Sequence, residues 1–214
     1  MLLLPEEPPE FGVIEFKLSL PPVSQQASTH AKKVFISEVR EITRPLEYLI
    51  DSEVQIDIDW FIHERLRWET DQSPDVDNII KPLLDALCGP EGILIDDCQV
   101  QSIQSSWINW TRQDQELAIR IRFDPDHYLQ KRGLSFVRMK DALCYPVPAE
   151  IREKGALQTW LNSIEQMLLA RCTMASLTGT YYPARYLLPP GLIHRSRVNG
   201  FPVHDLAALR AQSI

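Results

Sequence analysis

Residues 53–61 of this 214-residue chain, EVQIDIDWF, alternate between polar and apolar side chains almost without exception. Successive side chains of an extended strand point to opposite faces of a sheet, so this alternation predicts a strand with one buried face. The predicted buried face carries Val54, Ile56, Ile58 and Trp60. Such a strand is stable only within a sheet whose apolar face is packed against other elements. The rest of the chain therefore has to provide the other strands and the helices that cover that face.

The sequence around this strand predicts the elements that complete the sheet. Apolar side chains that recur every three or four positions predict helices over residues 28–49 and about 76–87. Alternating patterns predict further strands over residues 12–20, 93–95, 100–110 and 117–123. Residues 111–115 are expected to join the last two strands as a hairpin, and the polar residues 62–75 to form a loop. The predicted fold class is therefore α/β, or α+β, with a small mixed sheet covered by two helices.

Pro125 marks a change in the character of the chain. Residues 1–123 hold 11 Lys and Arg against 22 Asp and Glu, a net charge of −11, whereas residues 124–214 hold 11 against 7, a net charge of +4. We predict a first domain of residues 1–123 and a mildly basic C-terminal extension of residues 124–214. The extension is expected to be helical and irregular, with helices over residues 150–172 and 203–211. An acidic half beside a basic half argues against a protein that binds nucleic acid through one simple basic patch.

Composition excludes several other classes of protein. The sequence has no run of 18 apolar residues, so no membrane-spanning helix is expected, and its start lacks the regions of a signal peptide. Four cysteines at irregular spacings argue against a disulfide framework or a zinc site and favour the reducing cytoplasm. The eight glycines form no phosphate-binding loop, so no nucleotide cofactor is expected.

Two pairs of aspartates carry the strongest chemical signal in the chain. Asp75 and Asp77 stand at the start of the second predicted helix, and Asp96 and Asp97 stand at the start of a predicted strand. One acidic residue at a helix start is explained by capping of free N–H groups. Four carboxylates close together repel one another unless a cation lies among them. Hard oxygen donors in this number suit Mg²⁺ or Mn²⁺, which complete their shells with water and substrate phosphates.

A lysine lies within the same acidic stretch. Asp77, Lys81 and Asp85 are spaced by four residues, so on a helix they form one stripe, separate from the apolar residues of its buried face. Pro82 removes a helical hydrogen bond and disfavours helical geometry at the residue before it, which predicts an irregular first turn. The stripe places one positive charge among the carboxylates of the predicted metal site.

The order of these residues resembles the signature of RusA-type Holliday-junction resolvases. The shared pattern is Asp-x-Asp-Asn-x-x-Lys-x-x-x-Asp-Ala-Leu, followed after a glycine by Asp-Asp-x-Gln-Val, and the similarity extends over about residues 11–123. The resemblance implies a homodimeric enzyme of small α/β fold that nicks branched DNA with the help of Mg²⁺. It leaves two alternatives open: a non-catalytic DNA-binding or assembly protein of the same fold, and a nuclease for flaps or single strands.

Carried over by position, the resemblance implies the roles of the acidic stretch. Asp75, Asp77 and Asp97 correspond to the catalytic carboxylates and metal ligands, and Lys81 corresponds to the catalytic lysine, with Asp96 as a further candidate ligand. This complete set favours an enzyme over a non-catalytic protein.

The sequence departs from the family pattern in two places. Residues 72–74 (Gln-Ser-Pro) stand where family members often carry basic residues, and residues 124–214 have no counterpart in the compact family form. In this extension Arg185, Arg195 and Arg197 are candidates for contacts to DNA phosphates, although a solvated surface explains these arginines equally well.

Overall fold

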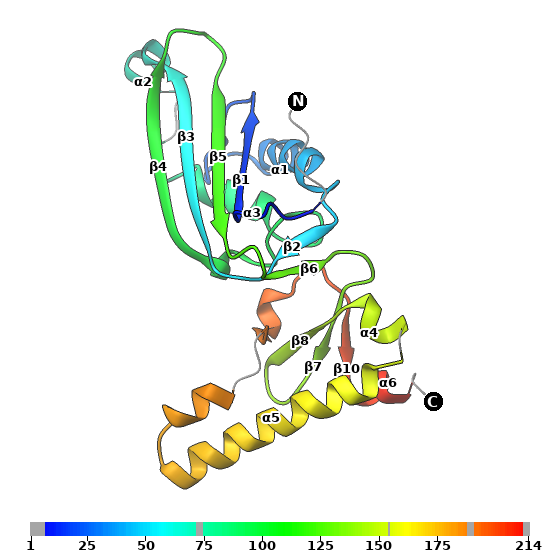
Figure 1. The fold of residues 1–214 in the computed structure, drawn as a ribbon. Helices are drawn as coiled ribbons and strands as arrows, with labels where there is room; N and C mark the ends of the chain where they lie inside the picture. Colours follow the sequence, from blue (N-terminus) through cyan, green and yellow to red (C-terminus); the bar gives the residue numbers. More distant parts are fainter. Residues whose placement is uncertain (1–6, 72–74, 154, 188–190, 212–214) are drawn as a thin grey trace. The chain divides into compact units, whose positions relative to one another are not determined.

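The chain folds as two compact units, which divide between Leu129 and Gln130 (Figure 1). Each unit has an apolar core of its own. The computed structural model describes residues 7–71, 75–153, 155–187 and 191–211.

A four-stranded mixed sheet forms the centre of the first unit, with the strand order β1-β5-β3-β4 (Figure 1). β5 (Glu116–Phe123) pairs antiparallel with both β1 (Val13–Leu18) and β3 (Val54–His63), whereas β3 and β4 (Val100–Trp110) run parallel. The buried face of β3 consists of residues that are at most 1% exposed, namely Val54, Ile56, Ile58, Trp60 and Ile62. The strand predicted over residues 53–61 is confirmed.

Two helices cover the apolar face of this sheet. α1 (Thr29–Thr43) begins after Ser28, whose hydroxyl accepts a hydrogen bond from the Ala31 amide, and it buries Phe35 and Val39. α3 (Ile80–Leu87) packs against α1 and buries most of its apolar residues in the same core. A mixed sheet beneath two helices is the fold class predicted from the sequence.

The predicted hairpin between β4 and β5 is wrong. The two strands are not neighbours, because β5 lies between β1 and β3 while β4 lies at the edge of the sheet. Every second residue of β5 from Leu117 to Phe123 is buried, whereas no residue of β4 is fully buried. Residues 111–115 therefore lead from the edge strand past β3 to the centre of the sheet.

The helix predicted over residues 28–49 ends early. Pro45 has no amide hydrogen to donate and its ring crowds the preceding turn, so α1 ends at Thr43. The apolar residues that follow form β2 (Tyr48–Ile50), which pairs with β6 (Tyr128–Gln130).

Two shorter segments also differ from their predictions. The polar stretch 62–75 was expected to be a loop, but it contains α2 (Glu64–Glu69). The strand expected over residues 93–95 is reduced to isolated bridges from Leu94 to Ile50 and Cys88.

Tyr48 is fully buried in the first unit, and its hydroxyl has no hydrogen-bond partner among the described residues. Burial disfavours the phenolate and raises the pKa of Tyr48 to about 12. We expect Tyr48→Phe to raise the free energy of unfolding by about 1–3 kcal/mol at neutral pH, which is the cost of an unsatisfied buried hydroxyl.

The same substitution has a pH signature. Unfolded tyrosine ionises near pH 10, whereas folded Tyr48 ionises only at about pH 12. Tyr48 therefore has no pH-dependent effect on the free energy of unfolding below about pH 10 and lowers it as the pH rises towards about 12, a loss that Tyr48→Phe lacks. Urea denaturation of both proteins between pH 7 and 12 checks this. Equal curves for Tyr48→Phe and the wild type over this range would contradict both the unsatisfied hydroxyl and its raised pKa.

The second unit contains a sheet that was not predicted from the sequence, where only helices and irregular structure were expected. Its strand order is β10-β7-β8-β9. The strands are β7 (Ser135–Arg138), β8 (Leu143–Val147), β9 (Ile193–His194) and β10 (Val203–Asp205). Each has between two and five residues, too few for an alternating pattern to be recognised.

The helices of the second unit are α4 (Ala149–Glu153), α5 (Leu157–Thr178) and α6 (Leu206–Ala211). The helix predicted over residues 150–172 is interrupted at Gly155, whose φ of 67° belongs to the left-handed region. The helix predicted over residues 203–211 starts later, because its first three residues form β10. No helix in the described segments is long and apolar enough to cross a membrane.

Candidate active site

Every carboxylate and the lysine of the predicted site lie in the connection between β3 and β4. Two parallel neighbours require the chain to return along the sheet before the second strand can begin. Residues 64–99 make this return through α2, a turn at residues 75–78, α3 and the short 3-10 helix η1 (Asp97–Gln99). One connection therefore carries the whole predicted set.

Lys81 forms ion pairs with two carboxylates of this connection. Its Nζ lies 2.7 Å from Oδ1 of Asp85, one helical turn later, and 2.8 Å from Oδ2 of Asp97. Hydrogen bonds to Asp85 and then Asp97 raise the pKa of Lys81, although partial burial lowers it. Lys81 is therefore charged at neutral pH. Its side chain is 49% exposed, so the ammonium group can be reached by an anion.

Asp75 and Asp77 lie before α3, not within its first turn. Asp75 belongs to a turn in which its carbonyl accepts a 3.0 Å hydrogen bond from the Asn78 amide, and both aspartates are exposed. The N-cap position of α3 is Ile79, which makes no side-chain capping bond. Capping of α3 therefore does not account for the two aspartates. The residues just before them, 72–74, lie outside the described part of the chain.

Asp96 and Asp97 introduce η1 on the other side of α3. Oδ1 of Asp96 accepts a 3.0 Å hydrogen bond from the Cys98 amide and so caps η1. Asp97 is the first residue of η1, and its carboxylate faces Lys81. The structure thus joins Asp97, Lys81 and Asp85, while Asp75 and Asp77 lie in the turn that leads into the same helix.

Gln99 fastens this segment to the chain at the end of β2 and before β3, a role that was not predicted from the sequence. Its Oε1 accepts hydrogen bonds from the amides of Ile95 and Asp96, at 2.8 and 3.1 Å. Its Nε2 donates to the carbonyls of Ile50 and Ser52, at 2.8 and 2.9 Å. All four hydrogen-bonding positions of the carboxamide are used. The signal that marks Gln99 in the sequence is its place in the pattern Asp-Asp-x-Gln-Val.

We expect Gln99→Ala to lower the free energy of unfolding by about 2–4 kcal/mol, because it removes four partly buried hydrogen bonds that each contribute about 1 kcal/mol. The matched control is Gln101→Ala, since Gln101 is exposed and bonds only to Glu53 among the described contacts of its side chain. We expect Gln101→Ala to change stability by less than about 0.5 kcal/mol. Urea denaturation compares the two, and equal losses would contradict a special role for Gln99.

Gly92 permits the tight turn between α3 and η1. A Cβ atom at this position would lie 2.1 Å from the carbonyl oxygen of Leu87. That oxygen accepts hydrogen bonds from the amides of Ile93 and Leu94, at 2.8 and 3.0 Å. The close approach of backbone to backbone requires glycine here, and it returns the chain from α3 towards the sheet.

The donor atoms of this connection are carboxylate oxygens, and their chemistry fits a hard divalent cation such as Mg²⁺. Within the part of the chain that the structure describes, no three His, Cys, Asp or Glu side chains lie close enough together to hold a metal ion. Burial, and then the charge of Asp97, raise the pKa of the neighbouring Cys88 to about 12. Cys88 therefore remains a thiol at neutral pH and does not add a thiolate to the donor set.

The three arginines predicted to contact DNA lie in the second unit. Arg185 belongs to the 3-10 helix η2 (Pro183–Leu187), and Arg195 and Arg197 belong to a separate one, η3 (Arg195–Arg197). All three side chains are exposed.

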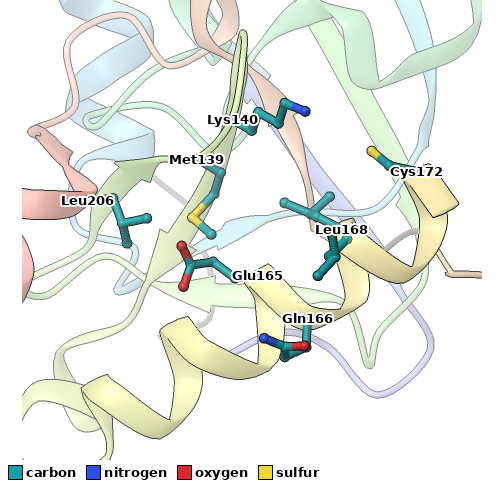
Figure 2. A pocket seen from close by; sticks show the side chains of 8 residues that line it. Met139, Lys140, Glu165, Gln166, Leu168, Cys172 and Leu206 are labelled. Atoms are coloured by element: carbon teal, nitrogen blue, oxygen red, sulfur yellow. The ribbon is translucent and has the colours of Figure 1, made fainter.

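The second unit also contains a hollow of about 470 Å³ between β7 and α5 (Figure 2). Its lining is mainly apolar and includes Met139, Leu168 and Leu206, with Lys140 and Glu165 beside them. Glu165 is ion-paired with Arg210. None of the residues predicted for the active site lines this hollow.

Comparison with protein families identifies the first unit. Residues 17–122 match the family described as Endodeoxyribonuclease RusA, whereas comparison with curated proteins gives no match. The matched segment begins within β1 and ends within β5, so it includes the connection that carries Lys81 and Asp97. The first unit of this chain belongs to the RusA endodeoxyribonuclease family.

Proposed function

We propose that this protein is a Mg²⁺-dependent endonuclease that nicks branched DNA, Holliday junctions in particular, during recombination and repair. The observation that supports this most directly is the position of Lys81. Its charged amine lies 2.8 Å from Asp97 inside the segment that matches an endodeoxyribonuclease family. A fixed positive charge beside carboxylates suits phosphodiester hydrolysis, in which negative charge develops on the phosphate oxygens.

In this proposal the aspartates and Lys81 have different roles. Asp75, Asp77 and Asp97 would hold Mg²⁺, or Mn²⁺, with Asp96 as a further candidate ligand. When bound, the metal ion neutralises charge on the phosphate and lowers the pKa of a water molecule. Lys81 keeps its proton at neutral pH, so it offers positive charge to the phosphate and does not act as a base.

We further propose that the protein acts as a homodimer in the cytoplasm. A four-way junction has two strands to be cut symmetrically, and a two-fold dimer presents two equivalent sites. The cysteines of the chain are free thiols, as suits a reducing compartment; they are Cys88, Cys98, Cys144 and Cys172.

The test is a cleavage assay with Mg²⁺ on end-labelled four-way junctions, flaps, linear duplexes and single strands. We expect paired, symmetric nicks in the junctions and no cutting of linear duplex. Preferential cutting of flaps or single strands would mean that these, and not Holliday junctions, are the substrates of the enzyme. Absence of cutting on every branched substrate would contradict an enzymatic function.

DNA binding by so acidic a first unit requires cationic contacts elsewhere, and Arg185, Arg195 and Arg197 are our candidates. We expect replacement of all three by Gln to reduce the slope of log Kd against log salt concentration by up to about 2.7, because each phosphate contact contributes about 0.9. Junction binding measured from 50 to 300 mM salt checks this. Arg112→Gln is the control, since Arg112 is exposed and paired with Asp114. An unchanged slope in the triple variant would exclude these arginines as phosphate contacts.

A further inference from the structure

α5 continues well beyond the core of the second unit. Its four buried residues, Leu157, Leu161, Ile164 and Leu168, lie within its first twelve residues, and no residue from 169 to 178 is buried. At 1.5 Å per residue, residues 169–178 add about 15 Å of helix without core contacts. After Gly179 the chain turns back, and η2 packs along α5, where Ala184 is buried (Figure 1, yellow and orange). We call residues 169–187 the arm.

Three exposed tyrosines and two arginines contact one another on the arm, which also exposes Leu169, Met174 and Leu177. The Arg185 guanidinium lies 4.3 Å from the ring centre of Tyr182 and 4.9 Å from that of Tyr186, and Arg171 lies 5.5 Å from that of Tyr181. Arg171 also donates a 3.0 Å hydrogen bond to the Tyr181 hydroxyl, and Arg185 a 3.1 Å bond to the Tyr186 hydroxyl. The tyrosines nevertheless remain 54–69% exposed. The arginines orient the rings and leave much of their surface open to solvent.

The charge of this region is unlike that of the rest of the chain. Residues 166–204 contain four arginines and no Asp or Glu, in a protein whose net charge is −7. Within the arm, the sequence Tyr-Tyr-Pro-Ala-Arg-Tyr at residues 181–186 places rings around a positive charge. Proteins that hold single-stranded nucleic acid use this combination, with bases stacked on aromatic rings and phosphates near arginines.

We propose that the arm binds single-stranded DNA. Unpaired bases offer free faces to Tyr181, Tyr182 and Tyr186, whereas the bases of a duplex are already stacked on one another. A protein partner could also cover exposed rings, but it does not account for 39 consecutive residues without a carboxylate. A polyanion does, because carboxylates would repel it. Resting on the proposed nuclease function, the arm directs the enzyme to branched DNA that has unpaired bases near the branch.

The test measures binding in EDTA, where no DNA is cut. A fluorescein-labelled 30-nucleotide single strand and the matching blunt duplex are titrated with the full-length protein, and binding is followed by fluorescence anisotropy. The variant carries Tyr181→Leu, Tyr182→Leu and Tyr186→Leu together. We expect its single-strand Kd to rise at least about tenfold, because loss of one stacked base already has about this effect. Its duplex Kd is expected to change less than about twofold.

Two further variants make the result specific to the rings. Phenylalanine at the same three positions keeps the aromatic faces, so this variant is expected to bind the single strand within about threefold of the wild type. Phe11→Leu removes an aromatic ring that is 88% exposed in the first unit, and it is expected to leave single-strand binding unchanged. Circular dichroism melting establishes that each variant is folded.

Two results would overturn the proposal. One is equal single-strand affinity of the leucine variant and the wild type. The other is conversion of a dimer into monomers, seen by light scattering, with unchanged DNA affinity, because the arm would then be a contact between protein chains. The binding assay does not measure nicking. A loss of single-strand binding in the leucine variant therefore supports the proposed role of the arm even if the cleavage assay finds no branched substrate. Conversely, if the leucine variant binds the single strand as tightly as the wild type, the proposal for the arm is wrong even when the protein cuts junctions.

Discussion

Replacement of Asp77 by asparagine is expected to slow junction nicking at least about a thousandfold, which corresponds to about 4 kcal/mol of lost transition-state stabilisation. The reason is that an amide oxygen is a weaker and uncharged donor for the metal ion that the proposed mechanism requires. Asp75→Asn and Asp97→Asn are expected to act alike. Single-turnover cleavage at saturating Mg²⁺ measures the effect.

The same substitution is expected to leave the fold intact. Asp77 is exposed and precedes α3 without capping it, so the free energy of unfolding in EDTA should change by less than about 0.5 kcal/mol or increase slightly as repulsion is relieved. Asp71→Asn is the matched control, an exposed carboxylate outside the predicted site, and it is expected to cut normally. Wild-type turnover of Asp77→Asn would remove Asp77 from the metal site.

Lys81→Ala is expected to lower the rate of nicking at saturating DNA by about a hundredfold to a thousandfold. A preorganised charge near the phosphate contributes about this much when it acts in the transition state. The Kd for a junction is expected to change less than about threefold, since one exposed lysine contributes little to a large DNA interface. The split between turnover and affinity distinguishes a role in chemistry from a role in binding.

We expect Lys81→Ala to have only a small effect on the free energy of unfolding. Asp85 and Asp97 lose their ion pairs in Lys81→Ala, but both are partly exposed, so the loss should be at most about 1 kcal/mol. Lys33→Ala, on the exposed side of α1, is the control for removal of a surface charge and is expected to cut normally. Normal cutting by Lys81→Ala at saturating DNA would exclude Lys81 from the mechanism.

Local patterns in the sequence predict the four strands of the central sheet of the first unit, but not the short strands β2 and β6. Alternation identifies β1, β3 and β5 because each buries one face against the helices, and that burial leaves a period of two in the sequence. Strand order leaves no such local trace. The insertion of β5 between β1 and β3 depends on contacts between residues far apart in the chain, so a hairpin of β4 and β5 was the wrong prediction.

The candidate site shows the same division between local and distant information. A spacing of four residues predicts that Lys81 and Asp85 approach each other, and their atoms lie 2.7 Å apart. The contact of Lys81 with Asp97 spans sixteen residues and depends on the turn at Gly92 and on the four hydrogen bonds of Gln99. Periodicity does not report such contacts. The resemblance to RusA resolvases pointed to Asp97. The structure shows that the turn at Gly92 and the hydrogen bonds of Gln99 hold Asp97 beside Lys81.

The parallel pairing of β3 and β4 has a consequence for the assembly of the candidate site. Contacts between distant residues require a loop to close, which costs conformational entropy. The arrangement of Lys81 and Asp97 rests on such contacts, namely the packing of α3 and the hydrogen bonds of Gln99 to Ile50 and Ser52. An incompletely folded chain therefore carries every residue of the site without its arrangement. The residues of the site are thus necessary but not sufficient, because their arrangement depends on the long-range contacts of the first unit.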